Sequence, residues 1–195
     1  MQGWNGYFLN VNLTKNTASP EPYTEDMAVN FLGGRGFAIK ILWDTLKRGT
    51  DPLSPENKLI FATGPLTGIG LPNSGKLVIA SKSPLTGGYG DGNSGSWVAV
   101  NIRKAGYEAI VIEGKASAPV ILHVKDKSWE FLDAGDLWGK SSFEVEDQLR
   151  SKYSRLAGII SIGPAGENLV KFANVVSQKG RAGGRPGMGT VMGSK

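Results

Sequence analysis

The sequence contains no cysteine and a single histidine among its 195 residues. Without a thiolate, the chain can supply no disulfide, no cysteine nucleophile, no cysteine-ligated zinc and no ligand to an iron–sulfur cluster. The one histidine, His123, lies in the alternating run 120–124, where we expect an ordinary strand residue without a catalytic role. Most histidine-based chemistry is thereby excluded.

Long apolar runs are also missing, since none approaches the ~18 residues of a membrane span. The amino terminus, Met1 to Trp4, lacks the basic and apolar regions of a signal peptide. With 40% hydrophobic and 20% charged residues, the composition is typical of a globular protein in water. We therefore expect a cytoplasmic protein with no membrane partner.

Basic residues outnumber acidic ones by 22 to 17, which favours anionic partners in general. They are dispersed, with no run longer than Lys47-Arg48 or Arg103-Lys104, so nucleic acid is not expected as a partner. The carboxyl-terminal segment differs, because its basic side chains stand among glycines and a small phosphorylated ligand would suit them. These basic residues are Lys171, Lys179, Arg181, Arg185 and Lys195.

Glycine is abundant, with 28 residues, roughly double its average usage. The glycines cluster at 33–36, 87–95 and 180–193. So much backbone without Cβ indicates loops that turn sharply or approach a ligand closely. The segment 87–95 is expected to be neither helix nor strand over any length.

Apolar periodicity predicts an α+β fold, because strand patterns outnumber helical ones and several strands follow one another directly. Strands are expected at 5–13, 58–63, 76–81, 107–112, 119–125, 128–132, 158–162 and 169–176. Helices are expected at 24–32, 37–46, 97–105 and 141–153, the last opened by the capping box Ser141-Ser-Phe-Glu144.

An internal repeat is also predicted. Residues 59–65 align with 158–164, and residues 76–79 align with 171–174. Each half reads as strand, Gly-Pro turn, strand and glycine-rich loop. The repeat predicts a domain with pseudo-twofold symmetry that presents two similar loops on one face.

Neither common nucleotide-binding motif is present. Residues 187–193 have the glycine spacing of a dinucleotide site, but Pro186 precedes them and no acid follows at the required distance. Residues 64–70 do not end in the Gly-Lys-Ser/Thr of a phosphate loop. Both a dinucleotide-binding site and a Walker-type site are therefore excluded.

The glycine-rich loops 87–95 and 180–189 are a candidate cradle for an anion. Backbone amides in such loops form anion-binding nests, and Arg181 and Arg185 can hold a phosphate bidentately, with Asn93 as a further polar group. The alternative is that these segments are simply tight turns. Because no acid–base or nucleophile–base pair is apparent from spacing, the residues indicate a binding domain better than a complete enzyme.

Nine segments, in order along the chain, carry a resemblance to a known family: Gly3-Trp4 with Val11–Thr14, Leu32–Gly36, Asp51–Asn57, Gly64–Gly68, Lys82–Gly87, Asn93–Gly95, Ala105–Tyr107 with Glu113–Lys115, Ser161–Asn168 and Gly189–Lys195. Over its whole length the sequence resembles the amino-terminal domain of the tungsten-containing aldehyde ferredoxin oxidoreductases. This resemblance implies two mainly antiparallel β-sheets with flanking helices, whose saddle-like surface carries tungsten or molybdenum held by the dithiolenes of two pterins.

The resemblance also implies a set of ligand-binding positions. In the family the two pterin phosphates share a magnesium ion, and the matching protein contacts here are Asn93 and the backbone carbonyl of Ala182. Lys76 stands where many members have an arginine, which keeps the charge but loses the planar guanidinium. No catalytic residue is assigned to this chain. The implied cofactor-binding residues are Lys76, Asn93, Ser94, Gly95, Arg181, Ala182, Gly183 and Arg185.

The activity implied by the resemblance is oxidation of aldehydes to carboxylic acids, with electrons passing through a 4Fe-4S cluster to ferredoxin. Residues 1–195 would then be the metallopterin-binding domain, a fragment that lacks the downstream helical domains with the cluster ligands and is inactive alone. Ferredoxin, those domains and a second copy of the chain are the expected partners. Two alternatives remain: a free-standing non-catalytic scaffold or cofactor carrier, and a binder of another phosphorylated ligand.

Overall fold

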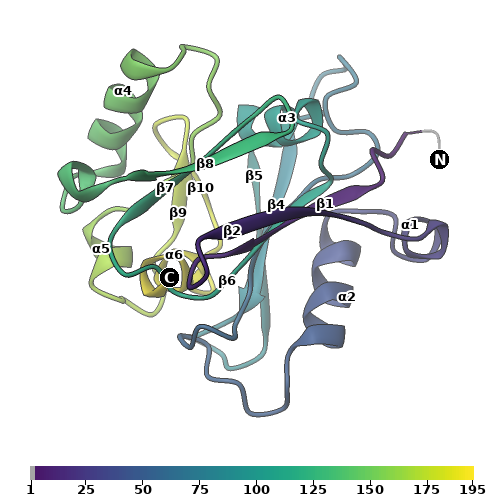
Figure 1. Ribbon diagram of the computed structural model, residues 1–195, viewed down its shortest axis with the longest axis horizontal. Coiled ribbons are helices and arrows are strands. Elements are labelled where there is room, and N and C mark those ends of the chain that lie inside the picture. The colour runs from purple at the N-terminus through teal and green to yellow at the C-terminus, as the bar shows by residue number, and fades with distance from the viewer. Residues whose placement is uncertain (1–2) are drawn as a thin grey trace.

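The computed structural model describes residues 3–195 and confirms an α+β fold. A six-stranded sheet with the order β2-β1-β6-β3-β4-β5 lies at its centre, and two two-stranded sheets, β9–β10 and β7–β8, lie to one side (Figure 1). Neighbouring strands are antiparallel except for the parallel pair β1–β6. The small sheets bring the total within the described residues to three, where two were expected.

The strands are β1 (Tyr7–Asn12), β2 (Thr17–Pro22), β3 (Leu59–Ala62), β4 (Lys76–Lys82), β5 (Tyr89–Gly95), β6 (Ala109–Glu113), β7 (Val120–Lys125), β8 (Ser128–Asp133), β9 (Val175–Ser177) and β10 (Arg181–Gly183). The helices are α1 (Glu25–Phe31), α2 (Arg35–Thr45), α3 (Trp97–Lys104), the 3-10 helix η1 (Gly135–Leu137), α4 (Ser142–Lys152), α5 (Pro164–Glu167) and α6 (Met188–Ser194). Within residues 3–195, none of these helices combines the length and apolarity that a membrane crossing requires.

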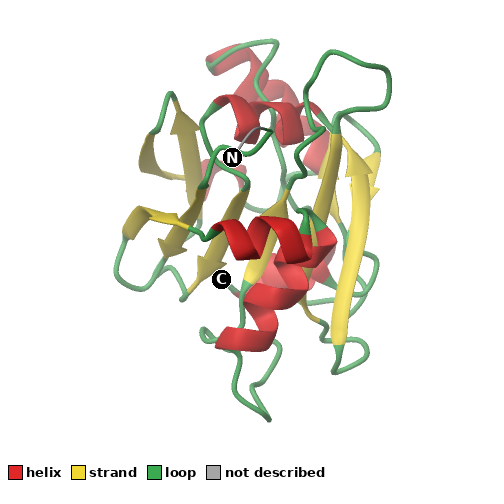
Figure 2. Ribbon diagram, turned by 90° about the vertical axis from the view of Figure 1, so that its right-hand side faces the viewer, coloured by secondary structure: helices red, strands yellow, loops and turns green. Residues whose placement is uncertain are grey.

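The central sheet has a hydrophobic core on each face, because side chains alternate along its strands. On one face, Ile60 and Val78 pack with α2 and its buried Phe37. On the other, Leu77 and Ile79 belong to a core that includes side chains of α3, α6 and β9. Figure 2 shows the helices on both sides of the sheet. The carboxyl-terminal segment thus packs on the second face of β4 and β5.

Two helices begin where the sequence predicts them, with capping side chains. The Oγ1 of Thr24 accepts a hydrogen bond from the backbone N–H of Met27 at 3.2 Å at the start of α1. Ser141 and Glu144 form the predicted capping box of α4, in which each side chain accepts from the backbone of the other residue. Such caps satisfy amides that the helix itself leaves unpaired.

The prediction for the glycine-rich segment 87–95 was wrong, because residues 89–95 form strand β5, paired with β4 over its whole length. A Cβ on Gly92 would lie 2.3 Å from the backbone nitrogen of Gly184, and one on Gly90 would lie 2.9 Å from Pro186. The glycines therefore serve a close approach between the sheet and the carboxyl-terminal segment.

The structure does not confirm the internal repeat. Residues 59–62 form β3, whereas the aligned residues 158–162 contribute only the isolated bridge between Ser161 and Val176. Residues 171–174 form a turn and a loop before β9, and α5 and α6 were not predicted. The aligned segments thus differ in secondary structure, and the repeat remains a sequence pattern.

His123 is a strand residue in β7, as expected. Its Nδ1 lies 2.6 Å from the carboxylate of Glu130 on β8, and its ring packs against Tyr153 with the centroids 4.7 Å apart. The histidine joins the β7–β8 hairpin to the carboxyl end of α4.

Candidate anion-binding site

The two glycine-rich segments meet at the edge of the central sheet, where β10 lies against the edge strand β5 (Figure 1). The hydroxyl of Ser94 donates a hydrogen bond to the carbonyl oxygen of Arg181 at 3.2 Å. A Cβ on Gly183 would lie 2.6 Å from the side chain of Ile79 and 3.3 Å from that of Ser94. The backbone of 181–183 is therefore in direct contact with β5.

The pleat of β4 and β5 sorts the candidate residues between the two faces of the sheet. Asn93 lies opposite Val78, and Gly95 lies opposite Lys76. Because Val78 packs towards α2, Lys76, Asn93 and Gly95 share that face. Lys76 and Asn93 are exposed there. Ser94 points to the opposite core and is 4% exposed.

Arg181 brings its guanidinium to the face that carries Asn93. A Cβ built on Gly95 would lie 3.0 Å from Nη1 of Arg181, so the guanidinium occupies the space that a side chain at position 95 would fill. The absence of that side chain lets Arg181 reach over the edge of the sheet. Lys76, Asn93 and the Arg181 guanidinium are thus presented together.

The backbone at Ala182 is turned away from its partner strand. Ala182 lies opposite Val176, but the N–H and carbonyl groups of Val176 both bond to Ser161, at 2.9 and 3.0 Å. The carbonyl of Ala182 consequently points away from β9, and the residue is exposed. A main-chain oxygen in this setting is a ligand type that Mg²⁺ accepts.

Three cations at this edge are not neutralised by the protein. Among residues 3–195, Lys76, Arg181 and Arg185 form no ion pair with a carboxylate. All three side chains belong to exposed residues. An exposed group of cations without acidic partners favours an anionic ligand.

The acid on the same face of β5 is already paired. Asp91 accepts hydrogen bonds from Nε and Nη2 of Arg35 on α2, the latter at 3.0 Å, and from the hydroxyl of Tyr89 at 3.0 Å. The bond from Arg35 lowers the pKa of the Asp91 carboxyl below its usual value. Because Asp91 is paired with Arg35, it does not offset the positive charge of Lys76 and Arg181.

Two predicted binding residues lie beneath the surface. The hydroxyl of Ser94 donates a hydrogen bond to the Arg181 carbonyl, and Gly183 is buried against Ile79. Both shape the surface on which Arg181 and Ala182 lie. Arg185, by contrast, is exposed. It follows Gly184, whose backbone lies against Gly92 of β5.

No group of three or more His, Cys, Asp or Glu side chains that could hold a metal ion occurs within the described part of the chain. The two residues that the family resemblance implies for magnesium, Asn93 and Ala182, would instead offer neutral oxygens, from the side-chain amide and the backbone carbonyl. A few neutral oxygens suit Mg²⁺ that keeps water and phosphate oxygens as its remaining ligands.

The structure adds residues that sequence spacing did not indicate. Glu146 on α4 accepts a hydrogen bond from the backbone N–H of Lys179, and Gln178 accepts one from the backbone N–H of Trp97. Both hold the β9–β10 turn, residues 178–180, which precedes Arg181. A glutamate in an ordinary amphipathic helix gives no sequence signal of such a contact.

Comparisons with known proteins agree with the family resemblance. Residues 8–195 match the family model for the aldehyde ferredoxin oxidoreductase amino-terminal domain. Over its full length the chain is 48% identical to a tungsten-containing aldehyde ferredoxin oxidoreductase of Pyrococcus furiosus and covers 32% of that protein. It is 37% identical to the WOR-like subunit of an aliphatic sulfonate oxidoreductase of Pyrococcus furiosus, covering all of this chain and 34% of that protein.

A solved structure has the same fold throughout the chain. It is the active-site complex BamBC of benzoyl coenzyme A reductase with 1,5-dienoyl-CoA, with a TM-score of 0.94, 33% sequence identity, and coverage of 100% of this chain and 30% of that one. The chain spans about a third of the length of the curated relatives it matches. These matches show that the chain belongs to the aldehyde ferredoxin oxidoreductase family, as its amino-terminal domain.

Proposed function

We propose that this chain is the metallopterin-binding domain of a cytoplasmic oxidoreductase that oxidises aldehydes to carboxylic acids and passes electrons to ferredoxin. The observation that carries the proposal is the grouping of Lys76, Asn93 and the Arg181 guanidinium on one face, without carboxylate partners within residues 3–195. Relatives that are 45% to 48% identical are named as tungsten-containing aldehyde ferredoxin oxidoreductases.

The residues at this face fit the phosphates of a tungsten or molybdenum bis-pterin. Arg181 offers a planar guanidinium that can bind two phosphate oxygens at once, and Lys76 offers a compact charge without that geometry. Arg185 provides a second guanidinium from the same segment. When bound, the cofactor supplies the redox chemistry, and the protein holds and orients it.

Magnesium would bind where the phosphates meet neutral protein oxygens. The Asn93 amide and the Ala182 carbonyl come from β5 and β10, which lie in contact. These oxygens would hold a Mg²⁺ ion together with the phosphates, and the ion would neutralise the phosphate charge that the protein's cations do not offset. Ser94 keeps Ala182 in place by binding its neighbour, Arg181.

The remaining parts of the reaction lie outside these residues. With no cysteine, the chain does not ligate the 4Fe-4S cluster, which we assign to downstream domains of the same polypeptide. Ferredoxin and a second copy of the protein are the further proposed partners. Because relatives of this domain are also named for an aliphatic sulfonate and for benzoyl coenzyme A, the domain holds the cofactor while other parts select the substrate.

Titration of the 195-residue chain with magnesium pyrophosphate tests the binding site, since pyrophosphate presents the charge of two adjacent phosphates. We expect calorimetry to show that the chain binds magnesium pyrophosphate. Arg181→Ala should weaken this binding about tenfold, because it removes one charge-assisted contact. The matched control is Lys104→Ala, which removes an exposed cation from the carboxyl end of α3 and should leave the affinity unchanged. Absence of binding, or equal affinity in wild type and Arg181→Ala, would contradict the proposal.

A further inference from the structure

The carboxylate of Glu146, on α4, is buried and makes a specific contact outside its own helix. The residue is 3% exposed. One carboxylate oxygen accepts from Nε of Arg150 at 2.7 Å, and the other accepts from the backbone N–H of Lys179 at 2.8 Å. Burying a charge is costly unless it is paired and hydrogen-bonded. This carboxylate meets both conditions through Arg150 and the turn that contains Lys179.

The turn that Glu146 binds is strained. Gln178 and Lys179 have φ values of 48° and 49°, and Gly180 has a φ of 137°. Two consecutive non-glycine residues in the left-handed region are costly, because Cβ crowds the backbone. Such a conformation persists when several surrounding contacts hold the backbone in place.

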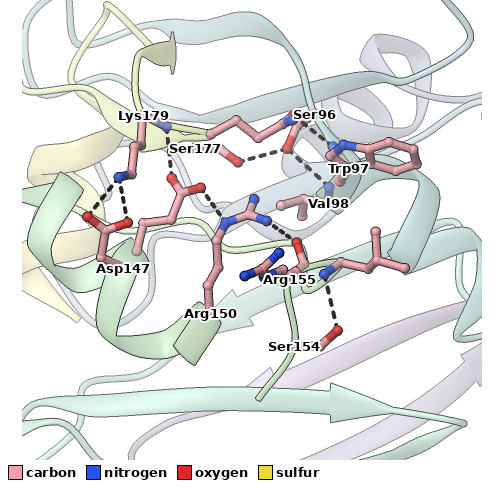
Figure 3. A network of polar contacts seen from close by, with 12 residues as sticks. Ser96, Trp97, Val98, Asp147, Arg150, Ser154, Arg155, Ser177 and Lys179 are labelled. Atoms are coloured by element: carbon pink, nitrogen blue, oxygen red, sulfur yellow. Dashed lines mark hydrogen bonds and ion pairs between the residues drawn. The ribbon is translucent and has the colours of Figure 1, made fainter. Parts of the chain in front are cut away.

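Further contacts attach the turn to α3. Gln178 accepts a hydrogen bond from the backbone N–H of Trp97 at 3.1 Å. The hydroxyls of Ser96 and Ser177, both buried, lie 2.9 Å apart. Figure 3 shows Ser96 and Ser177 facing each other, with Arg150 and Lys179 on the side of α4. The turn is therefore fixed between two helices.

This turn leads directly into the candidate site. Lys179 is followed by Gly180 and then by Arg181 and Ala182, the residues whose guanidinium and carbonyl we assign to the candidate site. A rotation of the turn would move both groups relative to Asn93 on β5. The conformation at residue 179 is thus a constraint on where the binding groups lie, beside the hydrogen bond from Ser94 to Arg181.

We propose that Glu146 is a positioning residue that holds the β9–β10 turn and thereby sets the Arg181 guanidinium and the Ala182 carbonyl for a phosphate ligand. The proposal rests on the proposed function. The Glu146 side chain is buried, and it acts on the turn through its hydrogen bond with the backbone N–H of Lys179.

The neighbouring acid, Asp147, provides a contrast on the same helix. Its carboxylate pairs with Nζ of Lys179 at 2.5 Å, but the two side chains are 59% and 52% exposed. Exposed ion pairs contribute little because solvent screens them. Asp147→Asn therefore removes a neighbouring acid from the same helix without disturbing the hydrogen bond between Glu146 and the backbone N–H of Lys179.

The test compares Glu146→Ala, Glu146→Gln and Asp147→Asn in the 195-residue chain by two readouts. The first is amide hydrogen exchange at residues 178–183, with β3 and β4 as internal references. The second is affinity for magnesium pyrophosphate. We expect Glu146→Ala to accelerate exchange at 178–183 and to weaken binding, each by about tenfold or more, while exchange in β3 and β4 stays unchanged. Glu146→Gln keeps an acceptor oxygen and should restore part of both, and Asp147→Asn should match wild type.

The two readouts separate this proposal from the function on which it rests. Unchanged exchange at 178–183 in Glu146→Ala, an equal acceleration over the whole chain, or an effect of Asp147→Asn as large as that of Glu146→Ala would overturn the positioning role. Intact pyrophosphate affinity in Glu146→Ala, with binding lost in Arg181→Ala, would overturn it while leaving the proposed function standing. Failure of the wild-type chain to bind would overturn the proposed function and the ligand role of Glu146 together.

Discussion

Ser94 and Arg181 stand 87 positions apart in the sequence, yet the hydroxyl of Ser94 donates a hydrogen bond to the carbonyl oxygen of Arg181 at 3.2 Å. This contact joins the edge strand of the central sheet to β10. It is reached because Gly92 and Gly183 leave no side chains between the two backbones. The candidate site therefore depends on the glycines that allow this close approach as well as on its charged side chains.

Gly92→Ala should separate these segments. The added Cβ would lie 2.3 Å from the backbone nitrogen of Gly184, and overpacking of this kind costs about 1 to 3 kcal/mol. Urea denaturation measures the loss in unfolding free energy. Gly88→Ala is the control, because its Cβ would meet only Thr86, at 3.9 Å, and should change stability by less than about 0.5 kcal/mol. Equal effects of the two substitutions would show that the close approach is not needed.

Glu108→Gln should destabilise the chain strongly. The Glu108 side chain is fully buried, accepts hydrogen bonds from the backbone N–H groups of Asn5 and Gly6 at 2.8 to 3.0 Å, and pairs with Arg103. Removing its charge leaves the Arg103 guanidinium without its partner, which costs about 3 to 5 kcal/mol in buried pairs. Thermal and urea unfolding should both report the loss, and a value within experimental error of wild type would refute it. Glu113→Gln, in a partly exposed pair with Lys58, should cost about 1 kcal/mol or less.

Tyr23 should make stability fall at alkaline pH. Burial raises the pKa of its hydroxyl to about 12, above the unfolded value of about 10, so the folded state holds this proton more tightly. Its contribution to stability is complete below pH 10 and is lost as the pH rises towards 12. Tyr23→Phe should therefore show a shallower decline between pH 10 and 12, although it is less stable at neutral pH, because Glu108 loses the hydrogen bond from the Tyr23 hydroxyl. Parallel pH curves for the two proteins would contradict this assignment.

Removing magnesium should weaken pyrophosphate binding by the chain. If Asn93 and Ala182 supply oxygens to Mg²⁺, excess EDTA eliminates that contribution and leaves only the contacts from the cations. Calorimetry with and without EDTA measures the difference. Asn93→Ala should show little further loss when magnesium is absent. An equal effect of Asn93→Ala with and without magnesium would place the amide outside the metal site.

The 195-residue chain should not oxidise an aldehyde with a viologen dye as electron acceptor. It has no cysteine to ligate a cluster, and we assign both the cluster and the substrate pocket to other parts of the protein. Spectrophotometry of the purified chain, supplied with cofactor, checks this. Turnover would mean that the assignment of these parts is wrong.

Local sequence signals predicted the elements that depend on local physics. The capping box at Ser141 and Glu144 and the alternating run around His123 gave the correct helix and strand, because capping and side-chain alternation are properties of short segments. Strand β5 was missed because glycine has low strand propensity, and its pairing with β4 and closeness to Gly184 are tertiary effects.

The candidate site was predictable in part. Asn93 and Arg181 were expected together, and the structure places them on one face. The positions of Ser94 and Gly183 beneath that face follow from the pleat and from packing on Ile79. The contact between Glu146 and the backbone N–H of Lys179 was not predicted. Residue spacing along α4 shows which side chains share a helix face, but it does not show which backbone amide that face contacts.

Retention of a tungsten bis-pterin shows whether this chain binds the metallopterin through Lys76 and Arg181. The purified chain is loaded with the cofactor extracted from a tungsten enzyme, excess is removed by gel filtration, and tungsten and phosphorus per chain are measured by elemental analysis. We expect the wild-type chain and Lys104→Ala to retain both elements together, and a Lys76→Ala/Arg181→Ala double variant to lose them. Retention by the double variant equal to that of wild type, or no retention by the wild-type chain, would contradict this expectation.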